Sequence, residues 1–314
     1  MSDQGSQPAS DEPRAASPAG GTFSNASAAM TPEQLQASAL LNKVLAVYGE
    51  IQNIGRHPGS LIDVDDRYMA RHGSSMQALV IHRLLSVMDH LQLATYTLAR
   101  LPQPLVFSQF TLIRSALAGA ATSLWIIDPP EFENRRIRAL KLACYDIDQY
   151  VNFANAALRD PAINSVEKAG SREIFRNNLE TMTMRRRNIY EEICAYESNL
   201  GKTKMPSVKG IGTINEVAIV QAAGKRLEEL GRMPSGIHAE LQYRILSGFV
   251  HNCIWASQVG ANATSQEMAR DGMYATTTER LEGNFHNVYN GAITAFEIAR
   301  LASSRFEELL TTPR

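Results

Sequence analysis

Apolar residues recur at helical spacing along nearly the whole chain after residue 30. Val80, Leu84 and Leu91, for instance, are four and seven positions apart, which places them on one face of a helix. Thr31 followed by Pro32 is typical of a helix start, because threonine can cap the first turn and proline fits the first helical position. No segment alternates apolar and polar residues for long enough to predict a strand. The pattern therefore predicts an all-α fold.

Glycine, proline and polar clusters divide this pattern into about eight helical segments. Loops are expected at Gly59–Gly73 and at residues 259–276, where there is room for a short hairpin. Connections as short as most of these favour one helical bundle over residues 31–314. The expected helices span residues 31–53, 76–99, 106–128, 131–158, 164–199, 215–230, 238–258 and 279–310.

Residues 1–30 differ in composition from the rest of the chain. They are rich in serine, alanine, glycine and proline, begin with an acidic stretch and contain no apolar block. Such a segment buries too little apolar surface to offset the chain entropy that folding removes. We expect a disordered tail here, and not a secretory signal peptide.

The overall composition is that of a soluble globular protein. Hydrophobic residues make up 44% of the chain and charged residues 20%, and the net charge is −1. This balance gives no general electrostatic reason to bind nucleic acid or an anionic membrane. No uncharged apolar run reaches the roughly 18 residues that a membrane span needs. The three cysteines are far apart and odd in number, which argues against disulfides and for a reducing, cytoplasmic location.

The usual signatures of nucleotide, metal and hydrolase sites are missing from the sequence. Gly201–Thr203 resembles the end of a phosphate-binding loop, but Tyr196 stands where that loop needs its first glycine. His251 and Cys253 are two positions apart, so on a helix they point in different directions. No nucleophile elbow of the G-x-S-x-G type is present. We expect no metal and no cofactor.

One stretch, YRILSGFVHNCIWA at Tyr243–Ala256, carries the residues that point to a function. Arg244, Ser247 and His251 are three and four positions apart, so they share a helix face. A histidine that moves protons beside an arginine that neutralises phosphate charge suits phosphodiester cleavage, with the ribose 2′-hydroxyl as nucleophile. Ser247 lies between them and could orient either side chain. Asn252 is adjacent and is a candidate ligand contact.

The same residues also have a structural explanation. Arg244 could pair with Glu240, one helical turn earlier, and His251 could pack in the core beside Phe249 and Trp255. An R-x6-H spacing is a weak motif, since a long helix can contain one without any functional meaning. The sequence leaves both interpretations open.

This stripe, on a late helix of an all-α chain, resembles the HEPN superfamily, whose signature is an arginine followed a few residues later by a histidine. The resemblance implies either a metal-independent ribonuclease, with Arg244 and His251 at a dimer interface, or a non-catalytic relative. The chain is also similar to uncharacterised bacterial helical proteins, in which Ala118 is often replaced by an acid. Ile245 stands where HEPN ribonucleases usually have a polar residue. The segments that carry the second resemblance are RSALAGAATSLWIIDP, RIRALKLACYDIDQ and YRILSGFVHNCIWA.

Arg114 is a charged residue inside the most apolar of the expected helices. A buried guanidinium needs carboxylate or carbonyl partners, because an unpaired buried charge costs several kcal/mol. Asp128, Asp146 or Asp148 could supply one and so fix the helix register. Alternatively, Arg114 could lie beside the Arg244 stripe and bind an anion with it.

A second basic feature is the run Arg185–Arg187 on the fifth expected helix. Three adjacent side chains fan over most of a helix circumference, so they cannot all face one groove. A solvated helix with pairs such as Arg187–Glu191 is therefore favoured over an RNA-binding patch.

Three classes of function stay open at this point. The chain is a HEPN-like protein that cleaves RNA or has lost that activity, a non-enzymatic protein that binds another protein, or a binder of a small anion. RNA or a protein is the expected partner, a homodimer is compatible with both, and no membrane association is expected.

Overall fold

The computed structural model describes residues 29–55, 57–105, 107–163, 168–201, 214–232, 236–267 and 277–314. Within them the chain forms ten helices and one β-hairpin, so the predicted all-α class is confirmed. Residues 1–28 of the expected tail lie outside the described residues. The elements are α1 (Pro32–Gln52), α2 (Leu61–Ala70), α3 (Met76–Arg100), α4 (Ser108–Ile127), α5 (Phe132–Arg159), α6 (Ala169–Asn199), α7 (Glu216–Glu229), α8 (Gly236–Val250), α9 (Ile254–Gly260), β1 (Ala261–Glu267), β2 (Thr277–Gly283) and α10 (Phe285–Thr311).

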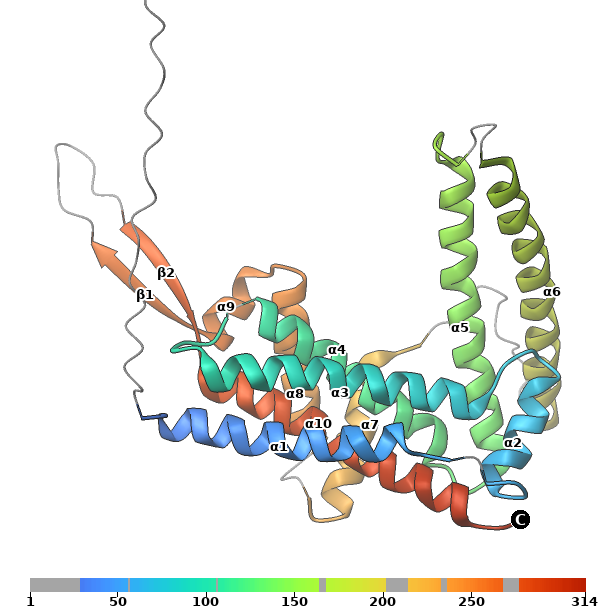
Figure 1. Cartoon of the computed structure of the whole chain (residues 1–314), viewed down its shortest axis with the longest axis horizontal. Coiled ribbons are helices and arrows are strands. Elements are labelled where there is room, and N and C mark those ends of the chain that lie inside the picture. The colour runs from blue at the N-terminus through green and yellow to red at the C-terminus, as the bar shows by residue number, and fades with distance from the viewer. Residues whose placement is uncertain are drawn as a thin grey trace, which may run out of the picture.

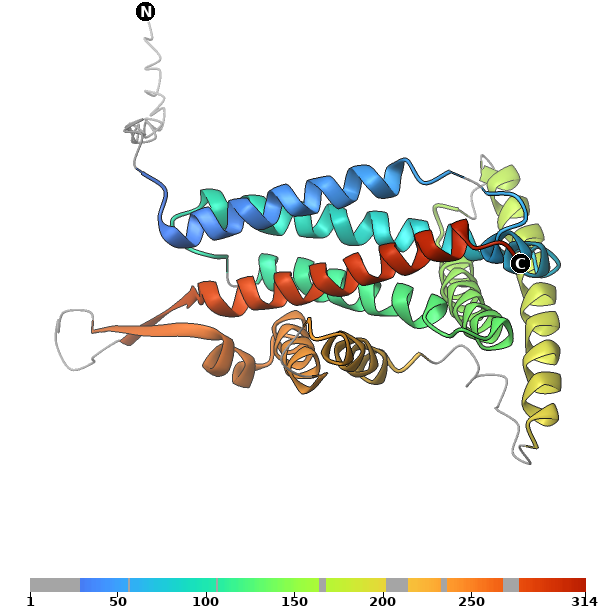
Figure 2. The ribbon, with the colours of Figure 1, turned by 90° about the horizontal axis from the view of Figure 1, so that it is seen from below.

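The bundle is built from three layers of paired helices (Figure 1). Figure 2 shows α1 and α3 in one outer layer, α4 and α10 in the middle, and α7 and α8 in the other outer layer. In that view α7 and α8 are seen nearly end-on, so they cross the middle layer instead of running along it. The α8 helix is therefore covered on one side by the bundle and open on the other.

Helix α4 lies where these layers meet and is apolar or small almost all round. A Cβ added at Gly119 would lie 2.8 Å from Val87 Cγ2 of α3, and one added at Gly291 of α10 would lie 3.0 Å from Ile113 Cγ2. These glycines let α3 and α10 approach α4 closely. Among the described helices, α4 is the one long and apolar enough to cross a membrane, and 67% of its most apolar window is buried inside the protein.

The loop expected at residues 59–73 is wrong, because Leu61–Ala70 form α2. Ser60 caps this helix, and its hydroxyl accepts a hydrogen bond from the backbone N–H of Asp63 at 3.2 Å. The buried face of α2 carries Asp65 and Asp66 as well as apolar residues. A partly charged buried face gives no clear apolar periodicity, so the helix is not visible in the hydrophobic pattern.

Asp65 joins α2 to α5 through a buried ion-pair cluster. The side chains of Asp65 and Arg135 are each 1% exposed, and their closest N–O distance is 2.9 Å. Arg135 also donates to the carbonyl oxygens of Pro129 and Pro130 at 3.1 and 2.7 Å. Arg136 donates to the other carboxylate oxygen at 2.9 Å. Burial raises the pKa of the Asp65 carboxyl, and the two guanidinium groups oppose that rise.

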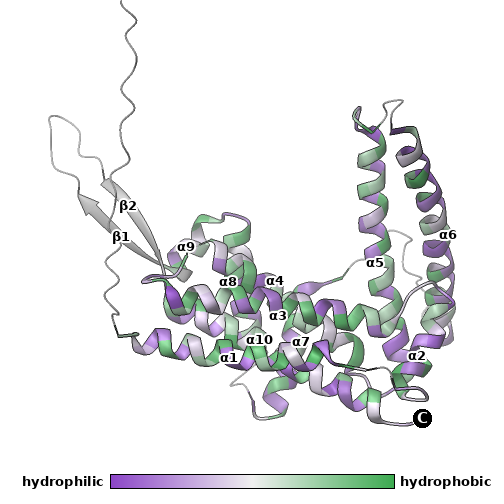
Figure 3. Ribbon diagram, in the orientation of Figure 1, coloured by the Kyte–Doolittle hydropathy of each residue, from purple (hydrophilic) through white to green (hydrophobic). Residues whose placement is uncertain are grey.

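Helices α5 and α6 form an antiparallel pair that extends away from the layered bundle (Figure 1). Most of the buried residues of α5 lie in its first half, up to Ile147, where it meets the bundle. Helix α6 packs against α5, and Figure 3 shows hydrophilic and hydrophobic residues interleaved along it. The distal part of this pair is an arm with little contribution to the core.

Two expected helices near the C-terminus are corrected by the structure. The helix expected over residues 238–258 is two helices, α8 and α9, separated by residues 251–253. The helix expected from residue 279 begins instead at Phe285, because residues 277–283 form β2 and pair antiparallel with β1. Asn284 caps α10 by accepting the N–H of Asn287 at 3.2 Å.

The buried cluster predicts that removing the Asp65 carboxylate destabilises the fold more than removing an exposed carboxylate does. Asp65→Ala leaves Arg135 buried without its anion and should lower the free energy of unfolding by about 3–5 kcal/mol. The matched control is Asp146→Ala, which removes a carboxylate that pairs with Arg83 at 3.0 Å but is 46% exposed. That change should cost about 0–1 kcal/mol. Urea unfolding followed by circular dichroism checks both values, and equal losses would contradict the assignment of Asp65 as a buried anchor.

Candidate functional site at helices α8 and α9

The break between α8 and α9 is a helix C-cap of the Schellman type. Asn252 has a φ of 53°, in the left-handed region that favours glycine or asparagine. Its N–H donates to the carbonyl oxygen of Phe249 at 3.1 Å, and the N–H of Cys253 donates to that of Gly248 at 2.8 Å. Asn252, proposed above as a ligand contact, therefore ends α8 through its backbone conformation.

The cap leaves Arg244, Ser247 and His251 on one side of α8. The N–H of His251 still donates to the carbonyl oxygen of Ser247 at 3.1 Å, so the helical spacing holds as far as the histidine. Arg244 and His251 are exposed and Ser247 is half-buried. The opposite side of α8 is buried through Leu246 and Phe249. The three candidate residues thus share an edge that faces solvent.

Arg244 and His251 do not form a pair within one chain. Arg244 Nε donates to Glu240 Oε1 at 2.7 Å, one turn toward the helix N-terminus. This direction is the one that long helical side chains usually take, and it leads away from His251. The imidazole of His251 has no hydrogen-bond or ion-pair partner among the described residues.

Exposed apolar side chains follow directly after the cap, on α9. Trp255 is 47% exposed and Ile254 is 79% exposed, although both follow directly from the cap. Trp255 and Ala256 pack back against Gly248, where an added Cβ would lie 2.6 Å from Ala256 Cβ. This contact fixes α9 against α8. We call this surface the α8–α9 edge, and its exposed members are Leu241, Arg244, His251, Ile254, Trp255 and Val259.

Arg114 lies on the buried side of α8, and its partner differs from those expected. Its Nη2 donates to Glu216 Oε2 at 2.7 Å and to Tyr243 Oη at 2.8 Å. The Tyr243 hydroxyl donates to the same Glu216 oxygen, and the Arg114 guanidinium lies over the tyrosine ring. Glu216 of α7 therefore supplies the carboxylate partner of Arg114, which an acid at position 118 supplies in the similar bacterial proteins according to the resemblance described above.

The three aspartates expected near Arg114 have other partners. Asp128 pairs with Arg226, Asp146 with Arg83 and Asp148 with Arg186. Arg114 is consequently a link between α4, α7 and α8, and its charge is matched by Glu216. The structure does not bring it to the exposed Arg244 edge as an anion-binding partner.

The arginine run of α6 is fully engaged in contacts within the chain. The predicted pair of Arg187 with Glu191 is confirmed, with Nε and Oε1 2.9 Å apart. Arg186 pairs with Asp148, and Arg185 donates to the carbonyl oxygen of His72 at 3.1 Å. Arg187 thus fits the predicted solvated helix, whereas Arg185 and Arg186 join α6 to its neighbours.

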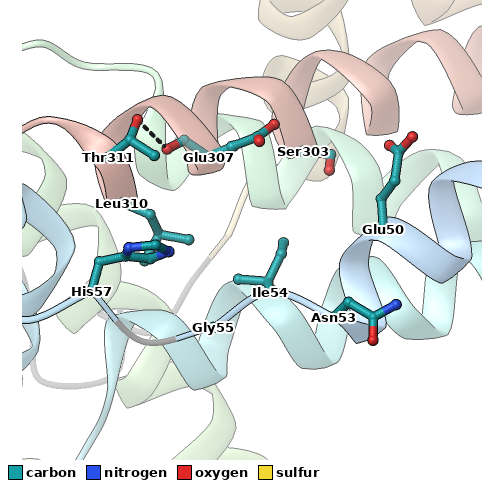
Figure 4. Close-up of a pocket in the computed structure, with 9 residues that line it drawn as sticks. All are labelled: Glu50, Asn53, Ile54, Gly55, His57, Ser303, Glu307, Leu310 and Thr311. Atoms are coloured by element: carbon teal, nitrogen blue, oxygen red, sulfur yellow. Dashed lines mark hydrogen bonds between the residues drawn. The ribbon is translucent and has the colours of Figure 1, made fainter.

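The hollow between α1 and α10 lies away from the α8–α9 edge. A hollow of about 510 Å³ separates the C-terminal ends of α1 and α10, where Glu50 and Glu307 lie on opposite walls near His57 (Figure 4). No group of three His, Cys, Asp or Glu side chains is placed to hold a metal ion in the part of the chain that the structure describes. Cys144, Cys194 and Cys253 are free thiols, as their spacing predicts.

Comparison with known proteins adds no relative. No family model, curated protein or solved structure matches this chain. The resemblance to HEPN proteins, the cytoplasmic location and the expected partners therefore stay predictions.

The Arg114–Glu216–Tyr243 cluster predicts a pH dependence of stability. Burial and the Glu216 carboxylate raise the pKa of Tyr243 to about 12 from its ordinary value of 10.0. Because the folded pKa is raised, the stabilisation is complete below pH 10 and is lost as the pH rises toward 12. Between pH 10 and pH 12, the free energy of unfolding of the wild type should therefore fall by roughly 2 kcal/mol more than that of Tyr243→Phe. Urea unfolding across this range tests the difference, and parallel losses in both proteins would contradict the buried position of the phenol.

Proposed function

We propose that this chain is a non-enzymatic helical interaction protein that self-associates through the α8–α9 edge. The observation that carries the proposal is the exposure of Ile254, Trp255 and Val259 on α9, which packs against the helix that carries Arg244. Exposed apolar groups gathered on one face are typical of interaction sites, and tryptophan and arginine are enriched among residues that dominate binding energy. Because α9 already packs against Gly248, such a contact costs little conformational entropy.

A second copy of the chain is the partner that the charge pattern favours. The ion pair of Arg244 with Glu240 puts both signs of charge on this face, so two copies related by a two-fold axis can exchange these pairs. The net charge of −1 gives little long-range repulsion between copies. The resemblance to HEPN proteins, which implies dimers with this helix at the interface, points the same way.

The absence of a preformed Arg244–His251 pair supports the non-enzymatic alternative. An arginine that stabilises a phosphate must be free to meet the charge that develops during reaction. Here its guanidinium is held by Glu240, and no group among the described residues orients the imidazole. The described surface around them has the features of a contact face.

Self-association predicts that a charge at Trp255 separates the copies. Trp255→Arg places a cation in the middle of the apolar part of the edge and should convert a dimer to a monomer at micromolar concentration. The matched control is Leu45→Arg, which adds the same charge at a residue 42% exposed on α1, in the opposite outer layer. Sedimentation equilibrium measures both masses. A monomeric wild type, or a dimer that survives Trp255→Arg, would contradict the proposal.

Metal-independent RNA cleavage is the second candidate function, because Arg244 and His251 are exposed on the same edge. A two-fold contact at this edge would bring two such pairs together, which one chain alone does not do. If the chain is a nuclease, it should cleave single-stranded RNA in the presence of a chelator, and His251→Gln should abolish cleavage without changing the melting temperature. The non-enzymatic proposal expects no cleavage above that of His251→Gln.

A further inference from the structure

Arginine and aromatic side chains alternate at the end of the bundle where α2, α5 and the C-terminal segment meet. The guanidinium carbons of Arg71 and Arg136 lie 4.7 and 4.6 Å from the centre of the Tyr68 ring. Arg136 also lies 4.6 Å from the centre of Phe132, and Arg314 lies 5.9 Å from the same ring. Three cations are thus interleaved with two rings drawn from three separate parts of the sequence.

This stack borders an open hollow of about 430 Å³ with a basic wall. We call it the arginine basin, and its lining residues are Gly59, Val64, Arg67, Tyr68, Arg71, Arg136 and Arg314. All four of the charged residues in this lining are arginines. The basin lies at the end of the bundle opposite the β-hairpin and α9 (Figure 1), so it is separate from the α8–α9 edge.

The surrounding contacts hold the basin in place. Arg136 is fixed by its bond to the buried Asp65, at 2.9 Å from Nε to Oδ1. The Tyr68 hydroxyl donates to Glu192 of α6 at 2.6 Å, which sets the ring orientation. On the remaining side, the N–H of Arg314 donates to the carbonyl oxygen of Gly59 at 3.3 Å. The Arg136 guanidinium and the Tyr68 ring are therefore arranged before any ligand arrives, which lowers the entropy cost of binding.

Two of the four arginines have no carboxylate partner among the described residues. Arg67 pairs with Asp63 at 3.1 Å and Arg136 with Asp65 at 2.9 Å. Arg71 and Arg314 contact only aromatic rings through their guanidinium groups. When a guanidinium lies over a ring, its N–H groups point outward in the plane of the guanidinium, where they can donate to an oxyanion. Both guanidinium groups therefore leave unused donors in the basin, although the terminal carboxylate of Arg314 offsets one positive charge.

We propose that the arginine basin binds the phosphate group of a phosphorylated ligand. Phosphate offers several oxygens with a charge near −2, and its geometry lets the forked donors of arginine bind two of them at once. Arg71 and Arg314 supply guanidinium groups that have no carboxylate partner among the described side chains, and Arg136 lines the same hollow. The nearby carboxylates of Asp63 and Asp65 are paired with Arg67 and with Arg135 and Arg136, so they offset those arginines and leave Arg71 unmatched.

Titration of the full chain with inorganic pyrophosphate, followed by calorimetry at constant ionic strength, tests this site. Wild type should bind, and Arg71→Gln should bind about tenfold more weakly or less, since a charge-assisted hydrogen bond contributes on that order. Arg71 is exposed, so its replacement should not affect folding. The matched control is Arg100→Gln, because Arg100 is also exposed and lies over a tyrosine ring, Tyr96, at 5.7 Å.

The same variants distinguish a site from a general salt effect. Equal binding heats in wild type, Arg71→Gln and Arg100→Gln would overturn the proposal, as would the absence of binding heat in wild type. Vesicles of phosphatidic acid identify the source of the phosphate. If wild type sediments with these vesicles and Arg71→Gln does not, the basin binds a lipid headgroup. If wild type binds pyrophosphate but not the vesicles, the basin binds a soluble ligand.

Discussion

Close packing around α4 is the constraint on which the rest of the structure depends. Because α4 is mostly buried, α8 must turn a complementary apolar face toward it, and Phe249 meets Phe110 with ring centres 4.0 Å apart. Tyr243 is held to the same side by Arg114. The 3.6-residue period then leaves Arg244 and His251 no place except the outer face. The exposure of the candidate edge is a consequence of the core.

The hydrophobic pattern predicts the long helices well because their burial is one-sided and apolar. It fails where a different interaction decides the structure. Helix α2 buries Asp65, and the ion pair with Arg135, 70 residues later, stabilises the buried carboxylate. Local periodicity carries no information about so distant a partner. The break at Asn252 depends on a left-handed backbone angle that no glycine or proline announces. The sequence signal for this break is Asn252 itself, because asparagine adopts the left-handed conformation more readily than most residues.

The candidate site was predictable in part for the same reason. The alignment of Arg244, Ser247 and His251 follows from helical spacing alone, and so does the pair with Glu240. The partner of Arg114 did not follow, because Glu216 is 102 positions away. The arginine basin also depends on distant segments, since Arg71, Arg136 and Arg314 meet only through the fold. Charged sites built from several elements become visible only when the elements are placed.

The central claim is that the outward edge of α8 and α9 is covered by a second copy of the chain. Hydrogen exchange measured over a range of protein concentrations tests it most directly, because a monomer and a dimer differ in the amides that the contact protects. The account predicts that protection rises with concentration in residues 241–259 and stays constant in α1. Exchange that is independent of concentration in α8 and α9, or protection that rises elsewhere, would contradict it.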